Sequence, residues 1–334
     1  MVLTCFPYHK TVRKVRVAPT AREPAESCDL MLCSHPNEAA QRFFDHFELL
    51  PASVPKRNAL VVVDQQLRDD GCNDSKTALR RQIMQQVLGQ QARQGGAIGV
   101  IAGSYPSARD FAKEVWAATE GRATKPRVLV FARDFEAQWK PRVQACQWHL
   151  VGALMLAGAL RLIEAGADVL CMPALTPHNP GVIKVLLSND EVARRLVSIT
   201  DATASHVIAC GFERVAVLGT RYVMTEEYLP AALDKLLEKV ATSAKFIFPR
   251  GGDFDALDSL CWEALMVDEF HEKDARMLNE IIERMRLSEG CDAVALACTE
   301  IPMLYQITQV EPALPALDPL KILVKSCVER VTVD

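Results

Sequence analysis

The chain has 334 residues, of which 49% are hydrophobic and 24% are charged, and its formal net charge is −4. A chain of this length and composition can bury a sizeable core, and it fits two α/β lobes with an extension better than one small domain. The weakly acidic balance argues against a partner that is nucleic acid or an anionic membrane surface.

The cysteines and the apolar segments narrow the class of protein further. The best candidate for a membrane span, residues 150–160, is too short and runs directly into Arg161. The 11 cysteines are scattered, form no C-x-x-C pair and show no His/Cys spacing typical of a zinc site. We therefore expect a reduced, cytoplasmic protein with no disulfide framework, no bound metal and no membrane contact.

The first part of the chain, residues 1–94, lacks a clear period and is predicted to be an N-terminal extension. Within it, 58–64 has the composition of a short strand and 75–94 that of a polar, glutamine-rich helix. Five basic residues precede the first acidic residue, Glu23: Lys10, Arg13, Lys14, Arg16 and Arg22. Two interpretations stay open, an organelle transit peptide and a basic tail that carries no address.

Regular alternation of strands and helices begins at Gly95. Strands are predicted at 97–101, 128–131, 168–172 and 196–199, and helices from 108, over 143–165 and over 202–209. Short apolar strands separated by helical segments are typical of a parallel sheet. Residues 95–212 are assigned to a first α/β lobe, and 313–334 are added to this lobe only by the family resemblance given below.

A second alternating set follows and is assigned to a second lobe, residues 213–312. Its strands are predicted at 215–218, 246–248 and 292–297, and its helices at 228–239, 255–266 and 273–287. A last strand is predicted after this lobe, at 313–317. In parallel sheets, ligands bind beyond the carboxyl ends of the strands. Ala174 and Cys298 each follow such a strand end, one in each set, which predicts two half-sites facing one cleft.

Five segments in chain order resemble the cofactor-independent aspartate/glutamate racemase family: 99–107, 131–135 (FARDF), 165–178 (AGADVLCMPALTPH), 218–224 (LGTRYVM) and 293–304 (AVALACTEIPML). The resemblance runs from Gly95 to the C-terminus and leaves out the extension. It implies an α/β fold of two pseudo-symmetric parallel-sheet lobes, and an amino-acid racemase that needs neither pyridoxal phosphate nor metal. It also implies a small acidic amino acid or dicarboxylate as substrate, and a homodimer.

In that family two groups, normally thiols, flank the α-carbon of the substrate, so that one removes its proton and the other reprotonates the opposite face. By resemblance, Cys298 takes the place of the second thiol, Ala174 stands where the first is expected, and Leu175 replaces an asparagine that helps to hold the substrate carboxylate. Alanine carries no proton, so ordinary two-thiol racemisation is in doubt. His178 is the nearest ionisable replacement, either as a base or as a structural histidine.

The remaining candidates each have a functional and a structural interpretation. Thr176 and Thr299 either hydrogen-bond the substrate carboxylate or cap helices. Thr220 and Arg221 either contact a side-chain carboxylate or form an exposed turn. Ser104 lies in a loop whose backbone N–H groups suit an anion, and Glu300 either tunes Cys298 or faces solvent in a first helical turn.

Three functions remain open at this point. The first is an amino-acid racemase or isomerase of the aspartate/glutamate class, with Cys298 as proton donor and acceptor. The second is a single-thiol decarboxylase or isomerase of a small dicarboxylate, and the third is a catalytically silent, ligand-binding homologue. Because all three share one fold, fold class does not choose among them.

Overall fold

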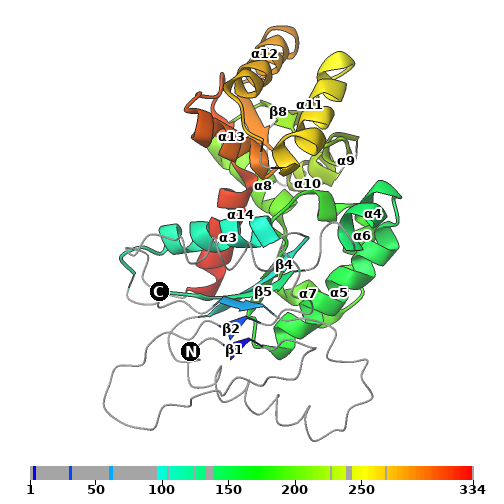
Figure 1. Cartoon of the computed structure of the whole chain (residues 1–334), viewed down its shortest axis with the longest axis vertical. Coiled ribbons are helices and arrows are strands. Elements are labelled where there is room, and N and C mark those ends of the chain that lie inside the picture. The colour runs from blue at the N-terminus through cyan, green and yellow to red at the C-terminus, as the bar shows by residue number, and fades with distance from the viewer. Residues whose placement is uncertain are drawn as a thin grey trace, which may run out of the picture. The chain divides into compact units, whose positions relative to one another are not determined.

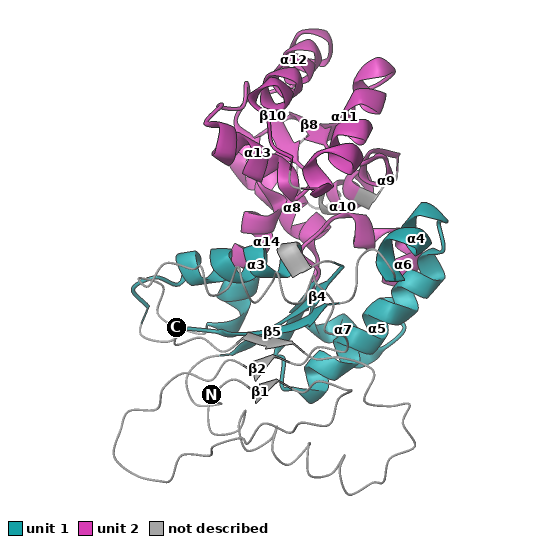
Figure 2. Ribbon diagram, viewed as in Figure 1, with its two compact units in different colours: residues 1–171, 185–196, 327–334 teal, residues 172–184, 197–326 magenta. Residues whose placement is uncertain are grey.

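A computed structural model describes residues 3–4, 30–31, 60–62, 96–103, 105–122, 125–132, 138–225, 228–237, 243–267 and 269–332. The chain divides into two compact units, coloured separately in Figure 2. Unit 1 comprises residues 1–171, 185–196 and 327–334, and unit 2 comprises residues 172–184 and 197–326. Each unit contains its own parallel sheet, so the predicted α/β class is confirmed.

The sheet of unit 1 has seven strands in the order β1-β2-β3-β5-β4-β6-β7. Their bounds are β1 Leu3–Thr4, β2 Leu30–Met31, β3 Leu60–Val62, β4 Ala97–Ala102, β5 Arg127–Ala132, β6 Val169–Cys171 and β7 Leu196–Val197. All six residues of β4 are buried, and β4 pairs in parallel with β5 and with β6. Continuous apolar strands of this kind are expected where helices cover both faces of a parallel sheet.

The described helices of unit 1 are α3 (Tyr105–Ala118), α4 (Lys140–Gln144), α5 (Trp148–Glu164) and α7 (Asp190–Arg195), and α6 (Pro180–Leu187) continues from unit 2 into unit 1. Figure 1 shows α5 beside the sheet, and it packs against β4 and β5. The predicted single helix over 143–165 is wrong at its start, because Cys146 adopts a positive φ of 51° and separates α4 from α5. None of the described helices is both long and apolar enough to cross a membrane.

The sheet of unit 2 has four strands in the order β11-β10-β8-β9, and every neighbouring pair is parallel. The bounds are β8 Arg214–Leu218, β9 Lys245–Ile247, β10 Ala293–Leu296 and β11 Ala316–Leu317. In the register of the central pair, Leu218 lies opposite Leu296. The two central strands therefore end together at one edge of the sheet.

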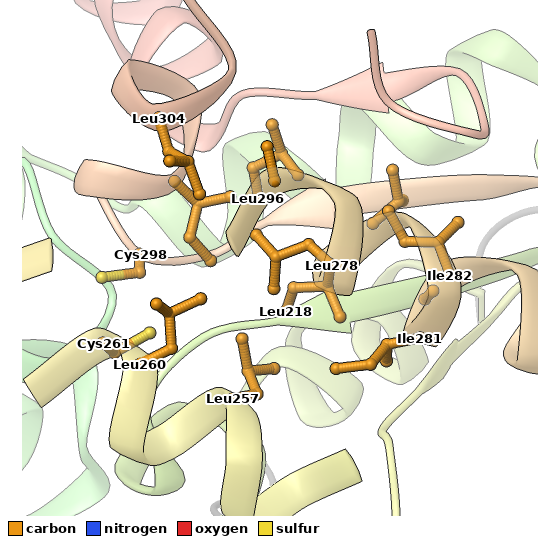
Figure 3. Close-up of a cluster of buried hydrophobic side chains, with 14 of the residues drawn as sticks. Leu218, Leu257, Leu260, Cys261, Leu278, Ile281, Ile282, Leu296, Cys298 and Leu304 are labelled. Carbon is orange, nitrogen blue, oxygen red and sulfur yellow. The ribbon is translucent and has the colours of Figure 1, made fainter. Parts of the chain in front are cut away.

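Helices complete unit 2 and supply most of its core. They are α8 (Ile199–Cys210), α9 (Arg221–Thr225), α10 (Tyr228–Leu237), α11 (Gly252–Glu263), α12 (Glu272–Glu289), α13 (Glu300–Thr308), most of α14 (Pro319–Val331), and the 3-10 turns η3 (Thr176–His178) and η4 (Leu265–Val267). Leucines and isoleucines at helical spacing on α11 and α12 pack over β8 and β10 (Figure 3). Each such side chain contributes about 1.5–3 kcal/mol when it is fully buried.

Two short strands bear on the predicted limits of the lobes: the last strand of the chain and the strand predicted within the N-terminal extension. The strand predicted with the first lobe forms as Ala316–Leu317, but it pairs with β10 in the sheet of unit 2. The short strand predicted at 58–64 forms at Leu60–Val62 and pairs with β5, so the extension supplies strands to the first sheet. The helix predicted at 75–94 lies outside the described residues.

Candidate active site

Cys298 lies two residues beyond the end of β10, and Thr220 lies at the equivalent position beyond the neighbouring strand β8. The amide of Ala297 donates to the carbonyl of Leu218 at 2.6 Å, which continues the strand pairing past the last registered residues. A Cβ atom on Gly219 would lie 3.1 Å from the carbonyl oxygen of Ala297. A residue without a side chain therefore lets the two strand ends approach, and Thr220 and Cys298 occupy equivalent positions after these neighbouring strands.

The thiol of Cys298 is buried, with 6% of the residue exposed, and it donates to Oε2 of Glu300 at 3.0 Å. The hydroxyl of Thr299 donates to the same carboxylate oxygen at 2.7 Å. Thr299 is the N-cap residue of α13, but its side chain makes no capping bond. The structure thus brings together the predicted trio of Cys298, Thr299 and Glu300, with the carboxylate as the shared acceptor.

A second thiol contacts Cys298 from α11. A hydrogen bond with Cys261, burial, and the charge and hydrogen bond of Glu300 raise the pKa of the Cys298 thiol well above its ordinary value. Figure 3 shows both sulfurs at one end of the apolar cluster of unit 2. Cys298 therefore keeps its proton at neutral pH and is a thiol rather than a thiolate.

Thr220 is buried, with 2% of the residue exposed, and its hydroxyl oxygen has no hydrogen-bond partner. Leaving such a group unpaired costs about 1–3 kcal/mol. An orphaned hydroxyl beside the Cys298 strand end is a position at which a polar ligand would complete the hydrogen bonding. Sequence analysis left Thr220 open between a ligand contact and a turn residue, and its buried hydroxyl has an open donor and acceptor.

Arg221, the other residue predicted at this turn, is engaged within unit 2. Its backbone amide donates to Oδ1 of Asp258 at 2.7 Å, and its Nε donates to Oδ2 of the same carboxylate at 2.5 Å. The guanidinium also lies over the ring of Phe254, 5.8 Å from the ring centroid. Asp258 is buried and anchors the start of α9 to α11.

Sequence analysis missed both Asp258 and Cys261, which lie three residues apart on α11. A spacing of three places two side chains on the same helix face, and here that face is the buried one. The available signal was an acid and a thiol on the apolar face of a predicted helix. A buried acid or thiol at such positions is compatible with a functional site and equally with simple packing in the core.

The segment after β6 carries the other predicted residues, and it belongs to unit 2. The Nδ1 of His178 lies 3.0 Å from the carbonyl oxygen of Ala174, so Nδ1 must carry the proton. Burial lowers the pKa of His178 to about 4, which makes the ring neutral at pH 7. Its Nε2 is buried without a hydrogen-bond partner and is free to accept one.

Two neighbours of His178 have different surroundings. Leu175 is buried in the core of the unit with 3% exposure, which is an apolar role that an asparagine would not fill. Thr176 begins the turn η3 and is half-buried. Ser104, which was predicted to bind an anion, lies outside the described residues.

Two further observations on the described residues concern a groove and metal binding. A groove of about 420 Å³ on unit 2 is lined by Phe246, Phe248, Phe254 and neighbouring residues, and none of the predicted site residues lines it. No group of three or more histidines, cysteines and acids in the described part of the chain is arranged to hold a metal ion. The thiol, carboxylate, hydroxyl and neutral imidazole groups described above can transfer protons and form hydrogen bonds.

Comparison with known proteins identifies a family for this chain. The model of the Asp/Glu/hydantoin racemase family matches residues 98–327. Among solved structures, a protein from Yersinia pestis described as a putative Asp/Glu racemase superposes with a TM-score of 0.56 at 22% identity, over 70% of this chain and 98% of that one. An aspartate racemase homologue from Pyrococcus horikoshii (TM-score 0.54, 24% identity) covers 70% and 97%, and an aspartate racemase from Picrophilus torridus (0.54, 21%) covers 72% and 96%.

Proposed function

The chain belongs to the Asp/Glu/hydantoin racemase family, and we propose that it is an isomerase that moves a proton at the α-carbon of a small acidic amino acid. The proposed proton carrier is Cys298. The observation that carries this proposal is the thiol at the end of β10, which donates to Glu300 beside the unpaired hydroxyl of Thr220. The proposed chemistry draws only on side chains of the chain.

The state of the thiol sets the order of events that we propose. Cys298 holds its proton at neutral pH, since Cys261, burial and Glu300 raise its pKa. Its proton therefore passes first to Glu300, which leaves the thiolate as the base that removes the α-proton and then returns a proton to the carbanion. A carboxylate 3.0 Å from the sulfur is placed to take that proton.

Inversion requires a group on the other face of the α-carbon, and the side chain of Ala174 has no proton to give. His178 is the proposed substitute, because its Nε2 has no partner. With a pKa of about 4, however, the imidazole is a weak base. We therefore expect proton exchange catalysed by Cys298 to be faster than inversion of the substrate.

The substrate contacts proposed from the same residues are polar and few. The hydroxyls of Thr220, Thr299 and Thr176 would donate to carboxylate oxygens of the ligand. Arg221 would meet a second carboxylate through the guanidinium N–H groups other than Nε, which Asp258 already accepts. Ser104 stays a proposed contact on sequence grounds alone.

The test is α-proton exchange, followed by NMR in deuterated water with each enantiomer of aspartate and glutamate. We expect deuterium to enter one enantiomer and the rate to fall by about 100-fold or more in Cys298→Ala, in line with the usual size of general acid–base effects. Cys210→Ala is the matched control, because Cys210 is an exposed thiol of the same unit. Exchange that survives in Cys298→Ala would refute the assignment of the thiol.

A second candidate is decarboxylation of a malonate-type dicarboxylate by the single thiol. A protonated Cys298, together with an alanine at position 174, favours it, because such a reaction needs one proton donor and no base. The substrate loses carbon dioxide, and the carbanion that remains takes the proton of the thiol. Release of carbon dioxide that disappears in Cys298→Ser supports this candidate, and no release from a panel of such acids argues against it.

Absence of turnover in both assays would leave a ligand-binding homologue without catalysis. That protein would still be stabilised by its ligand, since a compound that binds the folded state raises the unfolding temperature. Thermal shifts with acidic metabolites, without exchange or decarboxylation, are the result expected for this third alternative.

A further inference from the structure

A pair of neighbouring thiols, Cys261 and Cys298, is present in unit 2 in addition to the proposed acid/base chemistry. Cys261 lies near the C-terminal end of α11 and is fully buried, and Cys298 follows β10. The two thiols interact with each other and belong to the same cluster of buried side chains. Their sulfurs come from segments that are distant in sequence and meet at one end of that cluster (Figure 3).

We propose that Cys261 and Cys298 are a redox-modification site, at which hydrogen peroxide converts the two thiols into an intramolecular disulfide. The loss of the Cys298 proton carrier that would follow rests on the function proposed above. The disulfide itself does not, because it depends only on the two thiols and the oxidant.

The chemistry balances in two steps. The Cys298 sulfur attacks the peroxide, the O–O bond breaks, and Cys298 becomes a sulfenic acid while one molecule of water leaves. The Cys261 sulfur then attacks the Cys298 sulfur, the S–O bond breaks, and a second water leaves with the Cys261 proton. In total the two thiols lose two electrons and two protons, and one peroxide is reduced to two waters.

Cys298 is the sulfur that reacts first, for reasons of access and position. It retains 6% exposure and follows a strand end, whereas Cys261 is fully covered. The groups that face it are Cys261 and the carboxylate of Glu300, and both favour its protonated form. Because the thiolate is the nucleophile, we expect oxidation to accelerate roughly tenfold per pH unit while Cys298 remains mostly protonated.

The chain supplies an internal control in unit 1. Cys171, at the end of β6, forms a hydrogen bond with Cys327 of α14, and both residues are 0% exposed. This pair also has two interacting thiols, but neither residue retains any exposure. We expect it to stay reduced as long as the protein is folded.

The experiment treats the full chain with hydrogen peroxide at pH 7 and pH 9, alkylates the remaining thiols, and maps the peptides by mass spectrometry. We expect a linked peptide that joins Cys261 to Cys298, formed faster at pH 9 and reversed by dithiothreitol. Cys171 and Cys327 should be recovered in alkylated form. In Cys261→Ser, Cys298 should proceed to sulfinic acid, because no partner thiol resolves the sulfenic acid.

Several results would overturn the proposal. These are a linked peptide that joins Cys298 to another cysteine, equal yields of sulfinic acid in wild type and Cys261→Ser, or a Cys298 that stays reduced at both pH values. Failure of the proposed function would look different. A protein that forms the linkage but never exchanges an α-proton keeps the redox site and loses the isomerase assignment.

Discussion

At the scale of the residue, the proposed chemistry depends on where one proton resides. Cys298 has a thiol and a carboxylate as neighbours, and both contacts hold its proton on sulfur. His178 differs, because burial keeps its ring unprotonated and its Nε2 has no hydrogen-bond partner. The two side chains thus differ in protonation: one is a thiol that holds its proton, and the other is a neutral imidazole with a free acceptor nitrogen.

The buried state of His178 predicts how stability depends on pH. Its pKa is about 4 in the folded protein, against about 6.5 when unfolded. Between these values the unfolded chain binds more protons, so stability falls as pH falls through this window and is unaffected above it. We expect this histidine alone to lower the free energy of unfolding by about 2 kcal/mol between pH 7 and pH 5.

Urea denaturation at the two pH values checks this prediction. In His178→Asn, whose amide N–H can still donate to the Ala174 carbonyl, the loss of stability between pH 7 and pH 5 should shrink by that amount. His149→Asn is the control, because His149 is exposed on α5 and should leave the pH dependence as it is. An unchanged pH dependence in His178→Asn would show that the imidazole is not buried in its neutral form.

At the scale of the element, α11 is the helix that organises the carboxyl edge of the sheet in unit 2. Through Asp258 it holds the start of α9, which follows β8, and through Cys261 it contacts the residue that follows β10. Its leucines pack in the core between these two contacts. A helix far along the chain therefore fixes the positions of both strand ends.

Removing the carboxylate of Asp258 tests this role of α11. In Asp258→Ala the amide of Arg221 loses its acceptor, and we expect the free energy of unfolding to fall by about 1–3 kcal/mol. The half-exposed guanidinium contributes little of this, because solvent screens its ion pair. Asp258→Asn, which keeps an acceptor for the amide, should lose less.

Chemical denaturation with all three proteins, and with Asp255→Ala, measures the effect. Asp255 is an exposed acid on the same helix, so its removal should change stability by less than about 0.5 kcal/mol. If Asp258→Ala were no less stable than Asp255→Ala, the link between α9 and α11 would make no contribution to the free energy of unfolding.

At the scale of the whole molecule, the N-terminal extension is part of the first sheet. Residues Leu60–Val62 pair in parallel with Val128–Val130 of β5, and β1 and β2 continue the sheet beyond them. The family match begins only at residue 98. Without the strands of the extension, β5 would be the edge strand of this sheet.

Truncation tests whether this edge needs its cover. Removing residues 1–94 leaves the N–H and C=O groups of β5 unpaired on one side, and an uncovered apolar edge invites pairing between molecules. We expect the shortened chain to self-associate and to unfold at a lower temperature than a chain that lacks only residues 1–57, which retains β3. Light scattering after size-exclusion chromatography gives the answer, and two monodisperse, equally stable truncations would contradict it.

The sequence by itself determined the α/β class, the family, and most of the strands, because apolar strand runs and the helices between them are local patterns. It also singled out Cys298, Thr299 and Glu300, since three consecutive residues after a strand must lie near one another. Local pattern failed at Cys146, where a positive φ divides a helix that composition alone would continue.

Only the tertiary structure decided which partners these residues have. The contact of Cys261 with Cys298, the capture of Arg221 by Asp258 and the pairing of Ala316–Leu317 with β10 join segments that are distant in the chain. The raised pKa of Cys298 comes first from its contact with Cys261 and then from burial, and the lowered pKa of His178 comes from burial, so both depend on the packed molecule. Spacing along a chain records which residues are neighbours in an element, whereas contacts between elements and the loss of solvent arise only when the elements pack.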